Sequence, residues 1–220
     1  MIVSKKKPIS DILKSLHNYN KIFIIGCGTC STTCKSGGEA EVNWIKDELI
    51  RAGKTVTGST VIESPCIASQ VKVDFAKNRK LLSQSQAILV MACGSGVQSV
   101  LENDRLSLRV LPGCDTLFAA AIDASNAFRE YCSHCGQCVL DITGGICPVT
   151  RCAKGLLNGP CGGMNKGKCE VDKDQDCAWV LIYKQATKQN NLEAVKAIQP
   201  PKDHSKTIKP HKLILENKPR

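Results

Sequence analysis

Aromatic residues are scarce in this sequence: Phe, Trp and Tyr together make up 4% of its 220 residues. Hydrophobic residues of all kinds still reach 42%, so the chain has enough apolar side chains to bury a core. That core must be built mainly from Val, Ile, Leu and Ala, which are the usual filling between the layers of an α/β fold. The composition therefore favours an α/β domain.

Long apolar runs are also absent from the sequence. No stretch approaches the roughly 18–20 consecutive apolar residues that a membrane-spanning helix needs. The opening residues, MIVSKKKPIS, carry charges but are not followed by the apolar segment of a secretory signal. We therefore expect a cytoplasmic protein without a membrane partner.

Cysteine, in contrast, is abundant, with 14 residues. Cysteine-rich proteins are either disulfide scaffolds or metal proteins, and the redox state of the compartment decides between the two. Because thiols stay reduced in the cytosol, we interpret these cysteines as metal ligands.

The positive charge of the protein, +10 in total, is concentrated in its last segment. Residues 184–220 carry a net charge of +6, residues 132–183 carry none, and residues 1–131 carry +4. A positive surface attracts nucleic acid, anionic membranes or acidic protein partners. The alternative is a lysine-rich extension that only keeps the chain soluble.

The first half of the sequence alternates between strand and helix patterns. Short apolar or β-branched runs predict strands at residues 21–25, 54–62, 87–92 and 108–111. Apolar residues at helical spacing predict helices at residues 39–51 and 70–82. This alternation predicts a flavodoxin/Rossmann-like α/β domain over residues 1–130, with a mainly parallel sheet and helices on both faces.

The second half of the sequence changes character at Tyr131. Eight cysteines fall within residues 132–177, among many Gly and Pro residues. We expect a small irregular cysteine-rich metal-binding module over residues 131–183, because such a segment needs metal to hold it together. A helix is predicted over residues 178–197, and residues 199–220 are predicted to form a basic, extended C-terminal arm. Residues 184–220 are thus expected to be a helix and tail.

The cysteines of the first half follow the predicted strands. In an open parallel sheet, all strand-to-helix loops emerge at the carboxyl edge, where ligands bind. Cysteines far apart in sequence therefore converge there, and four thiolates can hold a [4Fe–4S] cluster. Two of the six are then spare, and each alone is also compatible with a small buried apolar residue. The six candidates are Cys27, Cys30, Cys34, Cys66, Cys93 and Cys114.

The same loop contains Gly26 and Gly28, which raises the alternative of a dinucleotide site. A lone G-x-G after a strand is weak evidence, and Ser31 stands where the third glycine is needed. We therefore expect no flavin or nucleotide site in this chain.

The cysteines of the second half number eight, enough for two sites of four thiolates. Their first four resemble the spacing of a ferredoxin run, whereas four cysteines also suit zinc. We expect at least one [4Fe–4S] cluster here and leave the other site as a third cluster or zinc. His134 is interpreted as a neighbour of the site and not a ligand. The eight are Cys132, Cys135, Cys138, Cys147, Cys152, Cys161, Cys169 and Cys177.

One segment carries a specific family resemblance. Its motifs are CAKGLLNGPCGG at residues 152–163, GKCEVD at residues 167–172 and DCAWVLIY at residues 176–183. They closely resemble the cysteine-rich domain of the small iron–sulfur subunit of methylenetetrahydrofolate reductase from acetogenic and other anaerobic microbes. The upstream cysteine run and the GCGTC loop fit the same layout.

The resemblance implies an accessory subunit of an oxidoreductase, without a catalytic residue or folate site of its own. Such a subunit passes electrons from ferredoxin or a further electron-input subunit to the FAD of a catalytic subunit. That partner reduces 5,10-methylenetetrahydrofolate to 5-methyltetrahydrofolate, a step of one-carbon metabolism in the Wood–Ljungdahl pathway. The implied cofactors are two [4Fe–4S] clusters, one per domain, with a third cluster or zinc in the module.

Two other functions remain open from the sequence. A zinc-stapled scaffold would assemble the same complex without a redox role. A zinc-ribbon nucleic-acid binder would explain the charge of +10, but the cysteine module is neutral and lacks interleaved aromatic residues. We expect the arm beginning at Gln199 to wrap onto the large subunit.

Overall fold

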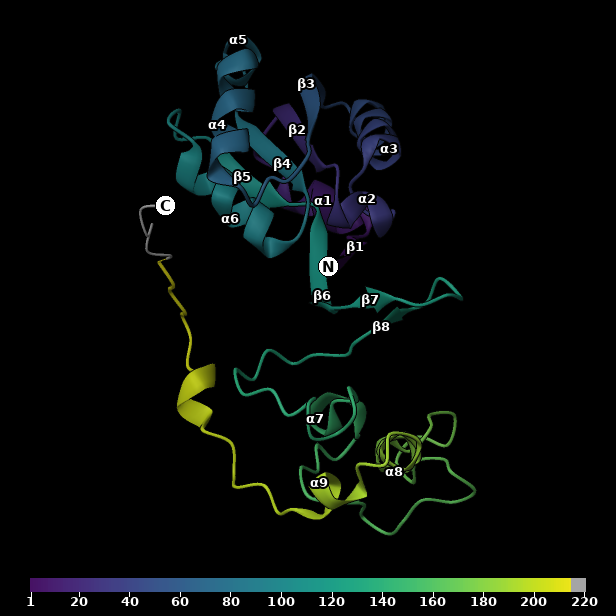
Figure 1. Ribbon diagram of the computed structural model, residues 1–220. Coiled ribbons are helices and arrows are strands. Elements are labelled where there is room, and N and C mark those ends of the chain that lie inside the picture. Colours follow the sequence, from purple (N-terminus) through teal and green to yellow (C-terminus); the bar gives the residue numbers. More distant parts are fainter. Residues whose placement is uncertain (215–220) are drawn as a thin grey trace. The chain divides into compact units, whose positions relative to one another are not determined.

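A four-stranded parallel sheet lies at the centre of the first half of the chain (Figure 1). Its strand order is β3-β2-β4-β5, and the bounds are β2 Lys21–Cys27, β3 Thr55–Ile62, β4 Ala87–Met91 and β5 Arg109–Pro112. The computed structural model describes residues 1–214, which divide into two compact units after Ala120. The predicted α/β fold with a mainly parallel sheet is confirmed.

The two central strands are buried on both faces because they consist almost entirely of apolar residues. In β2, Ile22 and Ile24 pack into one core cluster, whereas Phe23 and Ile25 pack into the other. This alternation is the two-residue period of a strand that has a core on each side. β2 and β4 run in register from Ile22 opposite Ala87, so both strands end at the same edge.

Helices cover both faces of the sheet, as predicted. One face is covered by α1 Ile9–Ser15 and α3 Glu39–Arg51, and the other by α4 Ala68–Lys77, α5 Arg79–Leu82 and α6 Gly94–Asn103. The predicted helix at residues 39–51 has the same bounds as α3. Its first turn is held by the backbone N–H of Gly38, which donates to Glu41 Oε2 at 3.0 Å. The predicted helix at residues 70–82 is instead two helices that meet at Asn78.

An antiparallel ribbon of β1 Ile2–Lys6 and β6 Cys114–Ala119 completes the first unit. The sequence did not predict this ribbon, and it corrects the placement of Cys114. That residue was expected in a loop but begins β6, where it pairs with Lys6. The correction arises because strand pairing across such a distance leaves no local signal.

The second unit has little regular structure, as expected for a cysteine-rich module. Its elements are β7 Ala121–Ile122, β8 Phe128–Arg129, α7 Pro148–Arg151, α8 Ala178–Lys188, α9 Leu192–Lys196 and the one-turn helix η1 His204–Thr207. The predicted helix at residues 178–197 is interrupted between α8 and α9, where Asn190 has a φ of +53°. A small core of Cys177, Trp179 and Ile182 holds α8 in place.

The predicted extended arm is described only as far as residue 214. Over residues 199–214 its only helical turn is η1, and residues 215–220 of the prediction lie outside the described residues. The division of the second half at residue 183 stays a prediction. Within residues 1–214, every helix is too short or too polar to cross a bilayer.

Candidate metal centres

Four cysteines follow strand ends around the point where the sheet changes direction. From β2 the chain moves outward to β3 and then crosses back to β4 on the other side of β2. Loops diverge at such a switch point and leave a crevice at the carboxyl edge, where ligands bind in open α/β sheets. Cys27 and Cys30 follow β2, Cys66 follows β3 and Cys93 follows β4.

The loop after β2 fixes Cys27 firmly. Its backbone N–H donates to Gly37 O at 2.8 Å, and its carbonyl accepts from Thr32 Oγ1 at 2.8 Å. Burial by itself raises the pKa of the Cys27 thiol. Hydrogen bonds from Ser31 and Thr29 outweigh that effect and leave the pKa below its ordinary value. A buried thiol with a lowered pKa is well suited to bind a metal as thiolate.

The loop that carries Cys66 is tied to the loops on either side. The backbone N–H of Gly28 donates to Ile62 O at 2.8 Å, which joins the ends of β2 and β3. On the other side, Pro65 lies so close to Gly96 of α6 that a Cβ there would be 3.2 Å from the proline ring. The three loops therefore form one surface.

The pKa of the Cys66 thiol reflects its surroundings at this edge of the sheet. Burial raises the pKa of the Cys66 thiol, and the negative charges of Cys93, Cys27 and Cys30 raise it further. Cys93 itself is 9% exposed and immediately precedes α6. The structure thus places four of the six predicted candidates in the loops that follow the carboxyl ends of β2, β3 and β4.

The remaining two cysteines of this unit bond to the backbone beside the β1–β6 ribbon. The Cys34 thiol donates to Ile2 O at 3.8 Å, and the Cys114 thiol donates to Ser36 O at 3.2 Å. Burial raises the pKa of Cys114 to about 12, so it keeps its proton at neutral pH. A protonated thiol that already donates to a carbonyl is poorly suited to ligate a metal.

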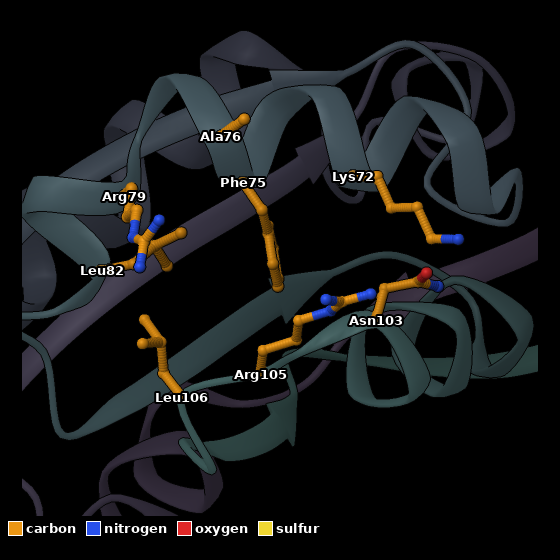
Figure 2. Close-up of a pocket in the computed structure, with 8 residues that line it drawn as sticks. All are labelled: Lys72, Phe75, Ala76, Arg79, Leu82, Asn103, Arg105 and Leu106. Atoms are coloured by element: carbon orange, nitrogen blue, oxygen red, sulfur yellow. The ribbon is translucent and has the colours of Figure 1, made fainter.

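A hollow of about 400 Å³ lies between α4, α5 and the end of α6 (Figure 2). Its lining includes three cations, Lys72, Arg79 and Arg105, together with the ring of Phe75. It lies toward the C-terminal ends of α4 and α6, away from the strand ends that carry the cysteines. Because its lining holds no cysteine, histidine or carboxylate, it is not part of a metal centre.

In the second unit, Cys132, Cys135 and Cys138 lie in a tightly turned loop. Both His134 and Gly136 have a positive φ, so the chain reverses between successive cysteines. The backbone N–H of His134 donates to Cys132 Sγ at 3.4 Å, and the His134 side chain is exposed. Backbone N–H groups aimed at sulfur are a usual feature of iron–sulfur loops.

Cys135 receives additional support from the C-terminal arm. The pKa of its thiol is lowered, first by a hydrogen bond with the backbone of Gln137 and then by the side chain of Lys202. Cys147, the fourth cysteine of this run, caps the start of α7, and its thiol lies 3.7 Å from Thr150 Oγ1. Lys202 was not singled out from the sequence, because only the fold brings it to Cys135.

The last four cysteines line a single small cavity of about 10 Å³. Its lining also includes Met164 and Trp179, and the four thiols are those of Cys152, Cys161, Cys169 and Cys177. A space of this size holds about one water molecule. Trp179 closes one side, and its Nε1 donates to Leu156 O at 3.0 Å.

Backbone groups also form hydrogen bonds with two of these thiols, those of Cys161 and Cys169. The backbone N–H of Gly163 donates to Cys161 Sγ at 3.4 Å, and the pKa of Cys169 is lowered chiefly by the backbones of Asp172 and Val171. Across residues 1–214, however, no three Cys, His or carboxylate side chains meet at the distances of a bound ion. All fourteen cysteines, which lie between residues 27 and 177, are free thiols.

Comparison with known proteins gives one match. The family model described as "Methylene-tetrahydrofolate reductase C terminal" matches residues 111–205, which include all eight cysteines of the second unit. No curated protein and no solved structure matches the chain. Over residues 111–205, the chain is thus similar to the C-terminal family of methylenetetrahydrofolate reductase.

Proposed function

We propose that this protein is an iron–sulfur electron-transfer subunit of a methylenetetrahydrofolate reductase complex. It receives electrons from ferredoxin or a further electron-input subunit and delivers them to the FAD of the catalytic subunit. The observation that carries the proposal is the placement of four cysteines in loops at the switch point of the sheet, on a chain similar to the reductase C-terminal family over residues 111–205.

In the first unit, the proposed ligands are Cys27, Cys30, Cys66 and Cys93. Their donor set suits a [4Fe–4S] cluster, which when bound supplies one-electron transfer to or from a flavin. The buried Cys27 and Cys93 exclude water from the inner side, whereas the exposed Cys66 leaves the outer side accessible to a redox partner. Cys34 and Cys114 are proposed to be structural.

In the second unit, we assign a second cluster to Cys132, Cys135, Cys138 and Cys147. The short spacing of the first three, their tight turns and the N–H···S bond at Cys132 support this assignment. At the cavity of the last four cysteines, the size favours a single ion over a cluster of eight atoms. Because four thiolates are a usual structural zinc site, we assign zinc there.

A surface for the catalytic subunit is offered by an apolar groove of about 800 Å³ beside α8 and α9. Trp179, Val180 and Tyr183 form its α8 side, and Tyr183 is 60% exposed although it is a large apolar side chain. Large exposed apolar surfaces typically mark interaction sites. The proposal places the complex in the cytoplasm, where thiolates stay reduced.

Anaerobic purification followed by metal and sulfide analysis tests the proposal. We expect a brown protein with about eight iron, about eight sulfide and about one zinc per chain, whose absorption near 400 nm bleaches with dithionite. The best-supported alternative is a zinc-stapled scaffold, since the small cavity suits zinc. A colourless protein that contains zinc but no iron would establish that scaffold and refute electron transfer.

A further inference from the structure

The start of the C-terminal arm is bound to the cysteine loops of its own unit. We call residues 199–206 the strap. At one end, Asn158 and Gln199 exchange two hydrogen bonds: Asn158 Nδ2 donates to Gln199 O at 2.9 Å, and the Gln199 N–H donates to Asn158 Oδ1 at 2.7 Å. Asn158 lies between Cys152 and Cys161, so this end holds the loop of the small cavity.

The other end of the strap holds the loop of the proposed second cluster. The Asp203 N–H donates to Gln137 Oε1 at 2.6 Å, and Lys202 Nζ donates to the Gln137 carbonyl. Lys206 lies against Gly136, where a Cβ would be 3.1 Å from the Lys206 Cβ. Gln137 is therefore fixed through its backbone and its side chain, and it stands between Cys135 and Cys138.

The middle of the strap is stiff, and its Lys202 side chain faces the Cys135–Cys138 loop. Pro200 and Pro201 fix two φ angles between the anchored ends, so less conformational entropy is lost when the strap docks. The Asp203 carboxylate is occupied by Ser205, whose N–H and hydroxyl both donate to Oδ1, at 3.0 and 2.6 Å. The Lys202 ammonium is thereby left to face the Cys135–Cys138 loop.

We propose that Lys202 is a positioning residue, held by the strap, that fixes the Cys135–Cys138 loop and raises the reduction potential of the cluster bound there. The inference rests on the proposed function. A nearby positive charge stabilises the reduced, more negative form of a thiolate-bound cluster, and hydrogen bonds to its sulfur atoms act in the same direction. The strap also slows metal loss, because the loop cannot open while both the backbone carbonyl and the side-chain amide of Gln137 are hydrogen-bonded to the strap.

The test compares full-length Lys202→Met, Lys202→Arg and Lys209→Met. Lys209→Met removes the same charge from an exposed residue outside the strap. We measure the midpoint potential by dye-mediated titration followed by electron paramagnetic resonance, and the rate of metal loss to a chelator. Lys202→Met is expected to lower the midpoint potential by about 59 mV, which corresponds to a tenfold change in the equilibrium constant for one electron. It is also expected to speed metal loss. Lys202→Arg and Lys209→Met are expected to stay near the wild type.

Each other outcome counts against the inference in a defined way. Unchanged potential and unchanged metal loss in Lys202→Met overturn it while leaving the proposed electron transfer intact. An equal shift in Lys209→Met overturns it as well, because net charge would then explain the effect. If the protein binds only zinc, the proposed electron transfer fails. If Lys202→Met then also leaves the rate of zinc release unchanged, the proposed role of Lys202 in holding the loop is overturned as well.

Discussion

Cys27 and Cys114 are almost equally buried, yet their surroundings move their thiol pKa values in opposite directions. Cys27 is 6% exposed and Cys114 is 4% exposed. Around Cys27, hydrogen bonds from Ser31 and Thr29 outweigh the effect of burial and lower the pKa, whereas at Cys114 burial dominates and raises the pKa to about 12. The balance between burial and neighbouring hydrogen bonds therefore differs at the two thiols, and it supports Cys27 as a proposed ligand and Cys114 as a proposed structural cysteine.

This difference predicts which substitutions remove iron. Cys27→Ser and Cys93→Ser are each expected to lose the cluster of the first unit, about half of the total iron, because three thiolates hold a cluster poorly. Cys34→Ser and Cys114→Ala serve as matched controls and should keep the full iron content. Iron and sulfide analysis of the anaerobically purified variants measures this. Loss of iron in Cys114→Ala but not in Cys93→Ser would contradict the proposed ligand set.

The raised pKa of Cys114 predicts a loss of stability at alkaline pH. The folded thiol keeps its proton up to a pKa of about 12, whereas in the unfolded chain it ionises near 9.0. Above pH 9 the unfolded state therefore binds fewer protons, and the free energy of unfolding falls by up to about 1.4 kcal/mol per pH unit. Below pH 9 this contribution is fully present.

Urea unfolding at several pH values between 8 and about 10.5 tests this contribution. The decrease in the free energy of unfolding per pH unit should be smaller in Cys114→Ala than in the wild type, because the variant lacks the titrating thiol. Cys34→Ala, which removes a less buried thiol of the same unit, provides the control. Equal slopes in the wild type and in Cys114→Ala would contradict the prediction.

At the scale of elements, the segment between α2 Cys30–Thr33 and α3 depends on a close backbone approach. Gly37 lies so near to β4 that a Cβ would be 1.7 Å from Met91 O, which is backbone and cannot yield. Gly37→Ala is expected to cost on the order of 3 kcal/mol or to prevent folding, and to displace Cys27, which donates to Gly37 O. Thermal unfolding and iron content measure both effects.

The control for this substitution is Gly53→Ala. Gly53 has a φ of +78° but open space around it, so alanine there costs only the strain of a left-handed residue, about 1 kcal/mol. If Gly37→Ala were no more destabilising than Gly53→Ala, the close approach to β4 would be wrong.

The elements that the sequence predicts are those whose signal is local. The apolar run at β2 and the periodic α3 identify themselves, because burial on both faces or on one stripe leaves a pattern in consecutive residues. The ribbon of β1 and β6 does not, since Ile2 finds its partner Ala119 only through the fold. The break at Asn78 was missed because Asn78 interrupts no apolar spacing.

The candidate sites show the same limit. That cysteines after parallel strands converge follows from topology, and so the edge with Cys27 and Cys93 could be expected. The proposal that Cys34 and Cys114 are the spare cysteines could not be made from the sequence, because it depends on their contacts with the carbonyls of Ile2 and Ser36. The contact of Lys202 with Gln137 joins residues 65 positions apart, and no sequence pattern marks it.

At the scale of the whole molecule, each unit has its own core. Both large core clusters lie within Met1–Ala120, together with every proposed ligand of the first cluster. A fragment of these residues is therefore expected to fold alone and to bind about four iron. Circular dichroism and iron analysis of the fragment test this, with its Cys93→Ser variant as the iron-free control. A fragment that is unfolded, or folded without iron, would contradict the prediction.

The pairing of β1 with β6 also bears on how the chain is made. β1 is synthesised before the rest of its unit, but its partner is completed only at Ala119. Met1 and Ala120 join each other by two further backbone hydrogen bonds, 119 positions apart. Contacts of such high sequence separation form slowly, because a long loop must close before they contribute. During synthesis, the nascent first unit therefore carries an unpaired strand until its last residues emerge.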